Sequence, residues 1–157
     1  FITSILMIIY WFYTRKVILS FNKSEKIQLY YLFGVLSGIF LFLHVLFLGS
    51  EIQNEFFQKV RRLFVVFFIF FELLAQLLLI RKLLIIRVTI NNFIRNILLQ
   101  IKKFFVYFFI FLTLITTSLL IIFNISKEIN YIIEWNYFVI LSFYYLLTFF
   151  LWKKINL

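Results

Sequence analysis

The sequence lacks cysteine, proline and aspartate altogether, and it has only three glycines among 157 residues. The absence of cysteine excludes a disulfide framework and any thiolate metal or redox site. Charged residues make up 14% of the chain, whereas a soluble domain averages about 25%. Hydrophobic residues take their place and make up 65% of the chain, a share that includes the 24% of aromatic residues. This composition excludes a soluble globular domain and a disordered chain, and it predicts a membrane protein.

The apolar residues fall into five runs along the chain, over residues 1–13, 27–49, 63–80, 104–123 and 131–152. A helix needs about 20 apolar residues to cross a bilayer, so the first run is expected to be a helix end or a truncated span. Because the chain begins with Phe1 and not with Met, its N-terminus is expected to be incomplete. The runs predict an all-α, polytopic membrane protein with about five membrane segments, forming a single membrane-embedded domain over residues 1–157.

The net charge is +10, from 16 Lys and Arg against six Glu, and the basic residues lie mostly between the apolar runs. If all five runs cross, twelve basic residues face one side of the membrane and four face the other. Positive loops stay on the negatively charged side, which places Lys153 and Lys154 there. Anionic lipid is therefore an expected partner, and nucleic acid is not. Trp11, Trp135 and Trp152 stand at ends of runs and are expected at the headgroup level.

The connection over residues 81–103 has helical periodicity and is not an ordinary loop. One face is apolar, and Arg87, Asn91 and Arg95 follow one another at four-residue intervals on the other. One interpretation is an amphipathic helix lying on the membrane surface. The other is a long tilted helix over residues 63–103, whose basic face packs against another protein.

Few polar groups lie inside the runs. Gly34 and Gly38 form a small-xxx-small pattern, which predicts close packing against another helix. His44 is the one histidine and cannot supply two axial haem ligands, so a structural role is expected. No Lys lies inside a run, which argues against a retinal Schiff base. Catalytic triads, phosphate-binding loops and metal-ligand clusters are not found either, so we expect no catalytic residue, no metal and no cofactor.

Glu72 is the most informative single residue, because it lies in the middle of the third run. A carboxylate at that depth is expensive, and a functional role is the default hypothesis for it. The alternative is a structural glutamate that is neutral or paired with an arginine. Glu134, near the start of the last run, is either a second functional carboxylate or an interfacial residue.

Over about residues 27–157 the chain resembles subunit a of the F-type ATP synthase, the membrane stator of its proton turbine. The matching positions, in order, are Gly49, Phe56-Phe57, Glu72, Arg81, Arg87-Val-Thr-Ile-Asn91 and Glu134. The chain departs from the family at Asn96, where a His or Glu is usual, in the shorter distance from Arg81 to Arg87, and in having no proline.

The resemblance implies a long tilted helix over residues 63–103 and two proton half-channels that open against a ring of c subunits. Arg87 would separate the half-channels, because a guanidinium keeps its proton in a protein and holds an arriving carboxylate in its charged form. The other implied site residues are Glu72, Glu134 and Asn91 for proton translocation, and Arg95 and Asn96 at the rotor interface. The chain would not be catalytic by itself. The c-ring and other membrane subunits would be its partners.

The resemblance and the composition together indicate a location. Asparagine, lysine and phenylalanine are abundant and Ala75 is the sole alanine, which is typical of an A+T-rich, often organellar genome. The mitochondrial inner membrane is therefore expected, with a bacterial inner membrane as the alternative. Other functions stay open: a membrane subunit of respiratory complex I similar to its subunit 6, which the segment around Gly34 and Gly38 loosely resembles, a structural subunit of a respiratory complex, or a small carrier.

Overall fold

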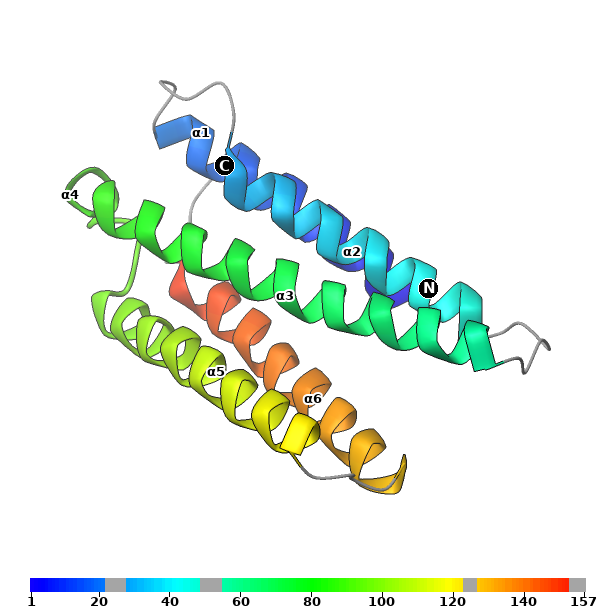
Figure 1. Ribbon diagram of the computed structural model, residues 1–157. Helices are drawn as coiled ribbons and strands as arrows, with labels where there is room; N and C mark the ends of the chain where they lie inside the picture. The colour runs from blue at the N-terminus through cyan, green and yellow to red at the C-terminus, as the bar shows by residue number, and fades with distance from the viewer. Residues whose placement is uncertain (22–27, 49–54, 123–126, 153–157) are drawn as a thin grey trace. The chain divides into compact units, whose positions relative to one another are not determined.

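A computed structural model describes residues 1–21, 28–48, 55–122 and 127–152, and the elements in these ranges are α-helices (Figure 1). The all-helical fold class is thereby confirmed. The chain divides into two compact units, Phe1–Ile86 and Arg87–Leu157. A single domain over residues 1–157 would require these units to associate, and it stays a prediction.

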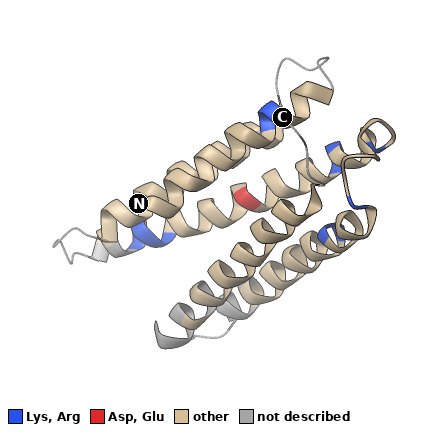
Figure 2. Ribbon diagram, turned by 180° about the vertical axis from the view of Figure 1, so that it is seen from behind, with Lys and Arg blue, Asp and Glu red and all other residues tan. Residues whose placement is uncertain are grey.

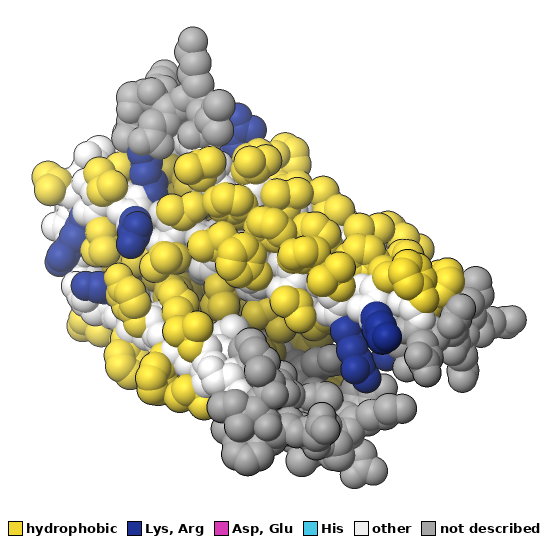
Figure 3. Space-filling model, in the orientation of Figure 1, with side chains coloured by type: hydrophobic (Ala, Val, Ile, Leu, Met, Phe, Trp, Pro, Cys, Tyr) yellow, Lys and Arg dark blue, Asp and Glu magenta, His cyan; other side chains and the backbone are white. Residues whose placement is uncertain are grey.

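Four of the described helices are long and apolar enough to cross a membrane. Their candidate spans are Ile2–Phe21, Leu29–Leu48, Lys59–Ile85 and Asn96–Thr116, and a shorter apolar helix covers Trp135–Leu151. Large apolar side chains such as Phe104, Leu114 and Phe149 are more than 60% exposed, and hydrophobic side chains cover most of the face shown in Figure 3. So much exposed apolar surface suits contact with lipid and does not suit contact with water. The chain is therefore an integral membrane protein.

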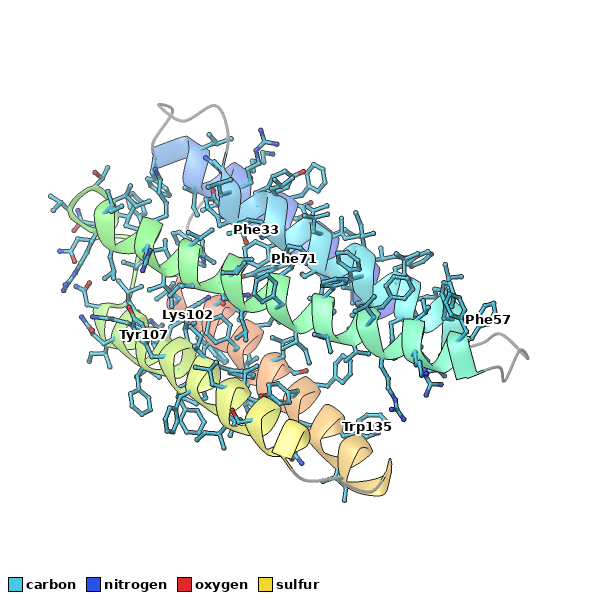
Figure 4. The ribbon with its side chains drawn as sticks, in the orientation of Figure 1. Phe33, Phe57, Phe71, Lys102, Tyr107 and Trp135 are labelled. Atoms are coloured by element: carbon cyan, nitrogen blue, oxygen red, sulfur yellow. The ribbon has the colours of Figure 1, made fainter. Side chains whose placement is uncertain are left out.

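The first unit is made of α1 (Ile2–Phe21), α2 (Leu29–Leu48) and α3 (Glu55–Ile85), and α2 packs against both of the others. Phenylalanines repeat every seven residues on the facing sides of α2 and α3, which keeps them on one face of each helix. The ring centroids of the facing pairs lie 5.8 Å apart for Phe33 and Phe71, 6.1 Å for Phe40 and Phe64, and 5.8 Å for Phe47 and Phe57. Residue numbers rise along one helix as they fall along the other, so the two helices are antiparallel. Figure 4 shows Phe33 and Phe71 pointing toward each other.

The first helix is longer than its apolar run. Instead of ending near residue 13, α1 continues to Phe21 and has the length of a full span. The helix accommodates its basic pair because the Arg15 guanidinium lies 4.7 Å from the centroid of the Tyr31 ring and Lys16 is exposed. The expectation of a truncated first segment is therefore wrong, and Trp11 lies in the middle of a span and not at its end.

The second unit is made of the short helix α4 (Arg87–Ile90), followed by α5 (Asn96–Ile122) and α6 (Lys127–Leu151). The two long helices pack antiparallel. Toward the C-terminal end of α5, the rings of Phe109 and Tyr137 lie 5.7 Å apart, and the hydroxyls of Thr116 and Tyr137 are 2.9 Å apart. At the other end, the Arg95 N–H donates to Leu151 O at 3.0 Å, which satisfies one of the carbonyls left free at the end of α6.

The structure does not contain one continuous helix over residues 63–103. Helix α3 ends at Ile85, and turns at Ile86 and over residues 91–93 flank α4 before α5 begins at Asn96. The physical reason is local, because Val88-Thr89-Ile90 is β-branched and Asn91-Asn92 favours turns by bonding nearby backbone. Both sequence-based interpretations of this segment, the long tilted helix and the surface helix over 81–103, are therefore wrong.

Candidate functional site

The most deeply buried acidic side chain among the described residues is Glu72, which is 1% exposed near the middle of α3 (Figure 2). Donors from all three helices of the first unit reach its carboxylate. Ser37 Oγ on α2 lies 2.6 Å from Oε2, and Trp11 Nε1 on α1 lies 3.4 Å from the same oxygen. Gln76 Nε2, one turn further along α3, donates to Oε1 at 2.6 Å. These three donors are neutral groups, and they contact a carboxylate in the middle of the span, where the sequence predicts a functional residue.

The phenylalanine contacts set the register that brings Ser37 to Glu72. The Phe71 ring stacks on both Phe33 and Phe40, with centroids 5.8 and 5.4 Å away. Ser37 lies between these two residues on α2, and Glu72 directly follows Phe71 on α3. The seven-residue aromatic repeat therefore holds the hydroxyl and the carboxylate at the same level.

The glycine at position 34 makes room for the third donor. A Cβ on Gly34 would lie 2.1 Å from Cδ2 of Trp11, so the indole occupies the space that any side chain at this position would fill. Gly38 is in a similar place one turn on, where a Cβ would lie 2.6 Å from Cγ1 of Ile8. The two glycines of the small-xxx-small pattern thus lie against α1, and Trp11 reaches Glu72 across the first of them.

The Ser37 hydroxyl has a choice of two acceptors. Its oxygen lies 2.6 Å from Glu72 Oε2 and 2.7 Å from Gly34 O, but a hydroxyl carries a single hydrogen. When Glu72 is ionised, Ser37 can donate to the carboxylate. When Glu72 is protonated, the acid can donate to Ser37 Oγ, while Ser37 donates to the Gly34 carbonyl. Hydrogen bonding is therefore satisfied in both protonation states.

Gln76 adds a second adaptable group to the same site. Its amide oxygen is buried and has no hydrogen-bond partner among the described residues. An amide rotated by half a turn would present this oxygen to Glu72 in place of its NH₂ group. Since an oxygen accepts from a protonated acid and an NH₂ donates to an ionised one, Gln76 can also serve both forms of Glu72.

A second group of predicted residues comes together at the start of the second unit. Arg87 Nε donates to Asn96 Oδ1 at 3.2 Å, and Asn96 Nδ2 donates to Asn91 Oδ1 at 2.6 Å. Arg95 is exposed and contributes its backbone N–H to the end of α6. Arg87 and Asn91 are therefore brought together by Asn96, whereas the four-residue spacing predicted Arg95 as the third member of this group. The three residues are joined by a turn and not by a helix face.

Glu72 and Glu134 were predicted to act in the same proton path as Arg87. Glu72 belongs to the first unit and Arg87 to the second. The side chain of Glu134, on α6, lies outside the described residues. Their expected roles in one proton path stay predictions.

Sequence reasoning assigned Trp11 to the membrane surface, but the structure places it in the site. The indole is fully buried at 0% exposure, and its N–H points to Glu72. The signal that could have found it is chemical, because an indole N–H in the middle of an apolar span needs an acceptor. Glu72 is the acidic group at a comparable depth in the sequence.

Lys102 is a fully buried charged group that the apolar runs did not reveal. It lies inside the candidate span of α5 and is 0% exposed, so the expectation that no Lys lies within a membrane segment is wrong. The reason is that α5 begins at Asn96, eight residues before the apolar run over residues 104–123. Its ammonium group donates to Thr148 Oγ1 on α6.

His44 is 8% exposed, and its Nδ1 lies 3.3 Å from Arg61 O on the neighbouring helix. This contact fits the structural role expected for it. Within the described ranges, no group of three or more His, Cys, Asp or Glu is placed to hold a metal ion.

The fold and its buried polar groups define an all-helical integral membrane protein with an ionisable group inside each of its two units. Comparison with models of known protein families found no match, and comparisons with curated proteins and with solved structures found none either.

Proposed function

We propose that this chain is a proton-translocating subunit of a membrane complex, in which Glu72 takes up and releases the transported proton. The observation that carries the proposal is the position of Ser37 Oγ between Glu72 Oε2 and Gly34 O, at 2.6 and 2.7 Å. A relay carboxylate has to exist in two protonation states, and this hydroxyl provides a hydrogen bond for each of them.

A purely structural glutamate needs only one of these states. A carboxylate that stayed ionised would be stabilised best by donors that cannot turn away, such as backbone N–H groups or an arginine. Two of the groups around Glu72, Ser37 and Gln76, can instead exchange donor and acceptor roles by rotation of a single bond. The adaptable surroundings therefore favour proton exchange over a fixed structural contact.

The finer form of the proposal is that the chain is the stator subunit of an F-type ATP synthase, with a c-ring as its partner. It is supported by the resemblance of the sequence and by Arg87, which Asn96 orients through its Nε while the rest of its planar guanidinium can bind a carboxylate. The long tilted helix that the resemblance implied is absent, so this form depends on Arg87 and its two asparagines. The location that follows from it is the mitochondrial inner membrane.

Proton flux into vesicles that contain the assembled complex tests the general proposal. Replacing Glu72 with Gln keeps the shape of the side chain and removes its proton-binding carboxylate. We expect the flux, followed with a pH-sensitive dye, to fall about 100-fold, as for the loss of a positioned proton-transfer group. Ser37→Ala should give a smaller loss, of about tenfold, which corresponds to about one hydrogen bond.

Ser142→Ala is the matched control for Ser37→Ala. Ser142 is exposed on α6 and donates to Phe138 O of its own helix at 2.9 Å. Its loss should leave the flux unchanged, and the amount of assembled complex in the membrane should be equal for all variants. Normal flux through an assembled Glu72→Gln complex would overturn the proposal.

Affinity purification of the complex from its native membrane tests the finer form. We expect c subunits to copurify with the chain, and Arg87→Ala to abolish ATP synthesis while the ring stays bound. Lys at this position should rescue poorly, because it lacks the planar, forked geometry. Purification with the subunits of an NADH dehydrogenase would reject the stator assignment in favour of the complex I alternative, while the role of Glu72 would be judged by flux.

A further inference from the structure

We infer that Lys102, in the second unit, is a second group of this chain that binds and releases the transported proton. This inference rests on the proposed function and extends it to a residue other than Glu72. Lys102 lies two turns into α5 and is completely buried. Figure 4 labels it on the side of α5 that faces α6. An ionisable group at such a position in a span marks a functional site by default.

The contacts of Lys102 with α6 come from two residues one helical turn apart. Its ammonium nitrogen donates to Thr148 Oγ1 and lies 4.4 Å from the centroid of the Tyr144 ring. Thr148 is 4% exposed and Tyr144 is 2% exposed, so the contacts are shielded as well as the charge. A hydroxyl oxygen and an aromatic face both stabilise a cation without being charged themselves.

Thr148 has the same kind of choice as Ser37. Its oxygen receives the Lys102 hydrogen bond and also lies 3.1 Å from Tyr144 O of its own helix. With a protonated Lys102, Thr148 can accept from the ammonium and donate to that carbonyl. With a neutral Lys102, Thr148 can turn its hydrogen toward the amine lone pair. Hydrogen bonding is again satisfied with and without the proton.

The sites around Glu72 and Lys102 therefore share one arrangement of hydrogen-bonding groups, although one ionisable group is an acid and the other is a base. In each, an ionisable side chain of one helix meets a hydroxyl of the neighbouring helix, and that hydroxyl can bond either the ionisable group or a carbonyl of its own helix. Glu72 with Ser37 and Gly34 forms the acidic version, and Lys102 with Thr148 and Tyr144 forms the basic one.

The proton balance of the step is simple. Lys102 in its ammonium form gives a proton to a water or carboxylate on one side of the path and keeps the nitrogen lone pair. It regains a proton from the other side, and no other bond forms or breaks. Among the contacts described above, Tyr144 is a titratable side chain that faces it from α6, and Lys103 is the next charged residue on α5, where it is half-buried.

Variants of Lys102 in the assembled complex test the inference by proton flux. Lys102→Met removes the amine and keeps most of the side-chain volume, and we expect the flux to fall about 100-fold. The proton flux through Lys102→Arg should fall by the same factor, because a guanidinium keeps its charge and cannot release the proton. The matched control is Lys103→Met, the same substitution at the adjacent lysine, which should change the flux less than about twofold, within the small range usual away from such sites.

Thr148→Val provides a second variant if Lys102→Met fails to assemble. It keeps the shape of the side chain and the charge of Lys102 but removes the exchanging hydroxyl, and it should lower the flux about tenfold. Full flux through an assembled Lys102→Arg complex would show that a fixed charge suffices, and it would overturn the inference. Full flux through Lys102→Met or Thr148→Val would do the same.

The outcome for Glu72→Gln separates this inference from the proposed function. If Glu72→Gln abolishes the flux and Lys102→Met does not, the chain moves protons without Lys102, and only the inference fails. If Glu72→Gln leaves the flux intact, the proposed function fails first.

Discussion

At the scale of the residue, depth in an apolar segment proved informative for an acid and misleading for an aromatic residue. Glu72 was singled out because a carboxylate in the middle of an apolar run is costly, and the structure buries it among three donors. Trp11 was misplaced because it stands near the end of the apolar run, although the helix continues past Arg15 and Lys16 to Phe21. The end of an apolar run and the end of a helix therefore differ wherever basic side chains can extend toward the membrane surface.

Gly34 is predicted to be essential for the position of Trp11. Gly34→Ala would place a methyl group 2.1 Å from a ring atom, so the rigid indole would have to move away from Glu72. We expect a loss of about 1–3 kcal/mol in the free energy of unfolding, the range for overpacking, measured by titration with a denaturing detergent. Fluorescence of Trp11 should shift as its surroundings change.

The neighbouring glycine provides the control for this prediction. Gly38→Ala would place its Cβ 2.6 Å from Cγ1 of Ile8, but an isoleucine side chain can change its rotamer more easily than an indole ring can shift. The loss for Gly38→Ala should therefore be the smaller of the two. Equal losses, with an unchanged tryptophan spectrum, would contradict the role given to Gly34.

At the scale of the element, the helices could be predicted from hydropathy, but the break between two of them could not. The apolar runs correspond to the cores of α1, α2, α3, α5 and α6 because a membrane segment has to satisfy its backbone internally. Over residues 81–103 the apolar periodicity of a helix continues without interruption, and periodicity was the main signal available. The turn depends on the local competition of Asn91 and Asn92 for backbone hydrogen bonds, which periodicity does not register.

The aromatic repeat between α2 and α3 is predicted to be the main determinant of their register. The Phe40 ring contacts three rings of α3, with centroids 5.2, 5.4 and 6.1 Å away. Phe40 is half-buried, so Phe40→Ala should lower the free energy of unfolding by about 3 kcal/mol, at the low end of the range for a Phe→Ala change. It should also lower proton flux by loosening Ser37 against Glu72. Phe111→Ala, at a position that is 61% exposed on α5, should cost less than about 0.5 kcal/mol. A cost at Phe40 no greater than at Phe111 would contradict this account.

At the scale of the whole molecule, composition fixes the class of the protein, and charge predicts its orientation. An apolar content of 65% and an exposed surface of large hydrophobic side chains lead to the same conclusion, an integral membrane protein. The candidate site was only partly predictable, because contacts between helices depend on register. The spacing of Ser37, Glu72 and Trp11 along the chain does not indicate that they meet. Lys102 was not recognised because α5 begins before the apolar run over residues 104–123. Orientation, in contrast, depends on simple counts of basic residues in the connections.

The C-terminal pair Lys153 and Lys154 lies outside the described residues, but the side of the membrane that it faces can be measured. If all five apolar helices cross, this pair is among the twelve basic residues on one side of the membrane, and the positive-inside rule places that side at the negative face. The shortest apolar segment, Trp135–Leu151, has 17 residues, which span about 26 Å at 1.5 Å per residue and just suffice for a bilayer core of about 30 Å with its flanking residues.

Because the chain has no native cysteine, Lys154→Cys and Lys59→Cys can each be labelled as single cysteines in sealed vesicles. A membrane-impermeant maleimide should reach position 154 only from the negative side and position 59 only from the opposite side. Labelling of both positions from the same side would mean that the number of crossings between them is even, and it would remove α6 or one of its neighbours from the membrane-spanning set.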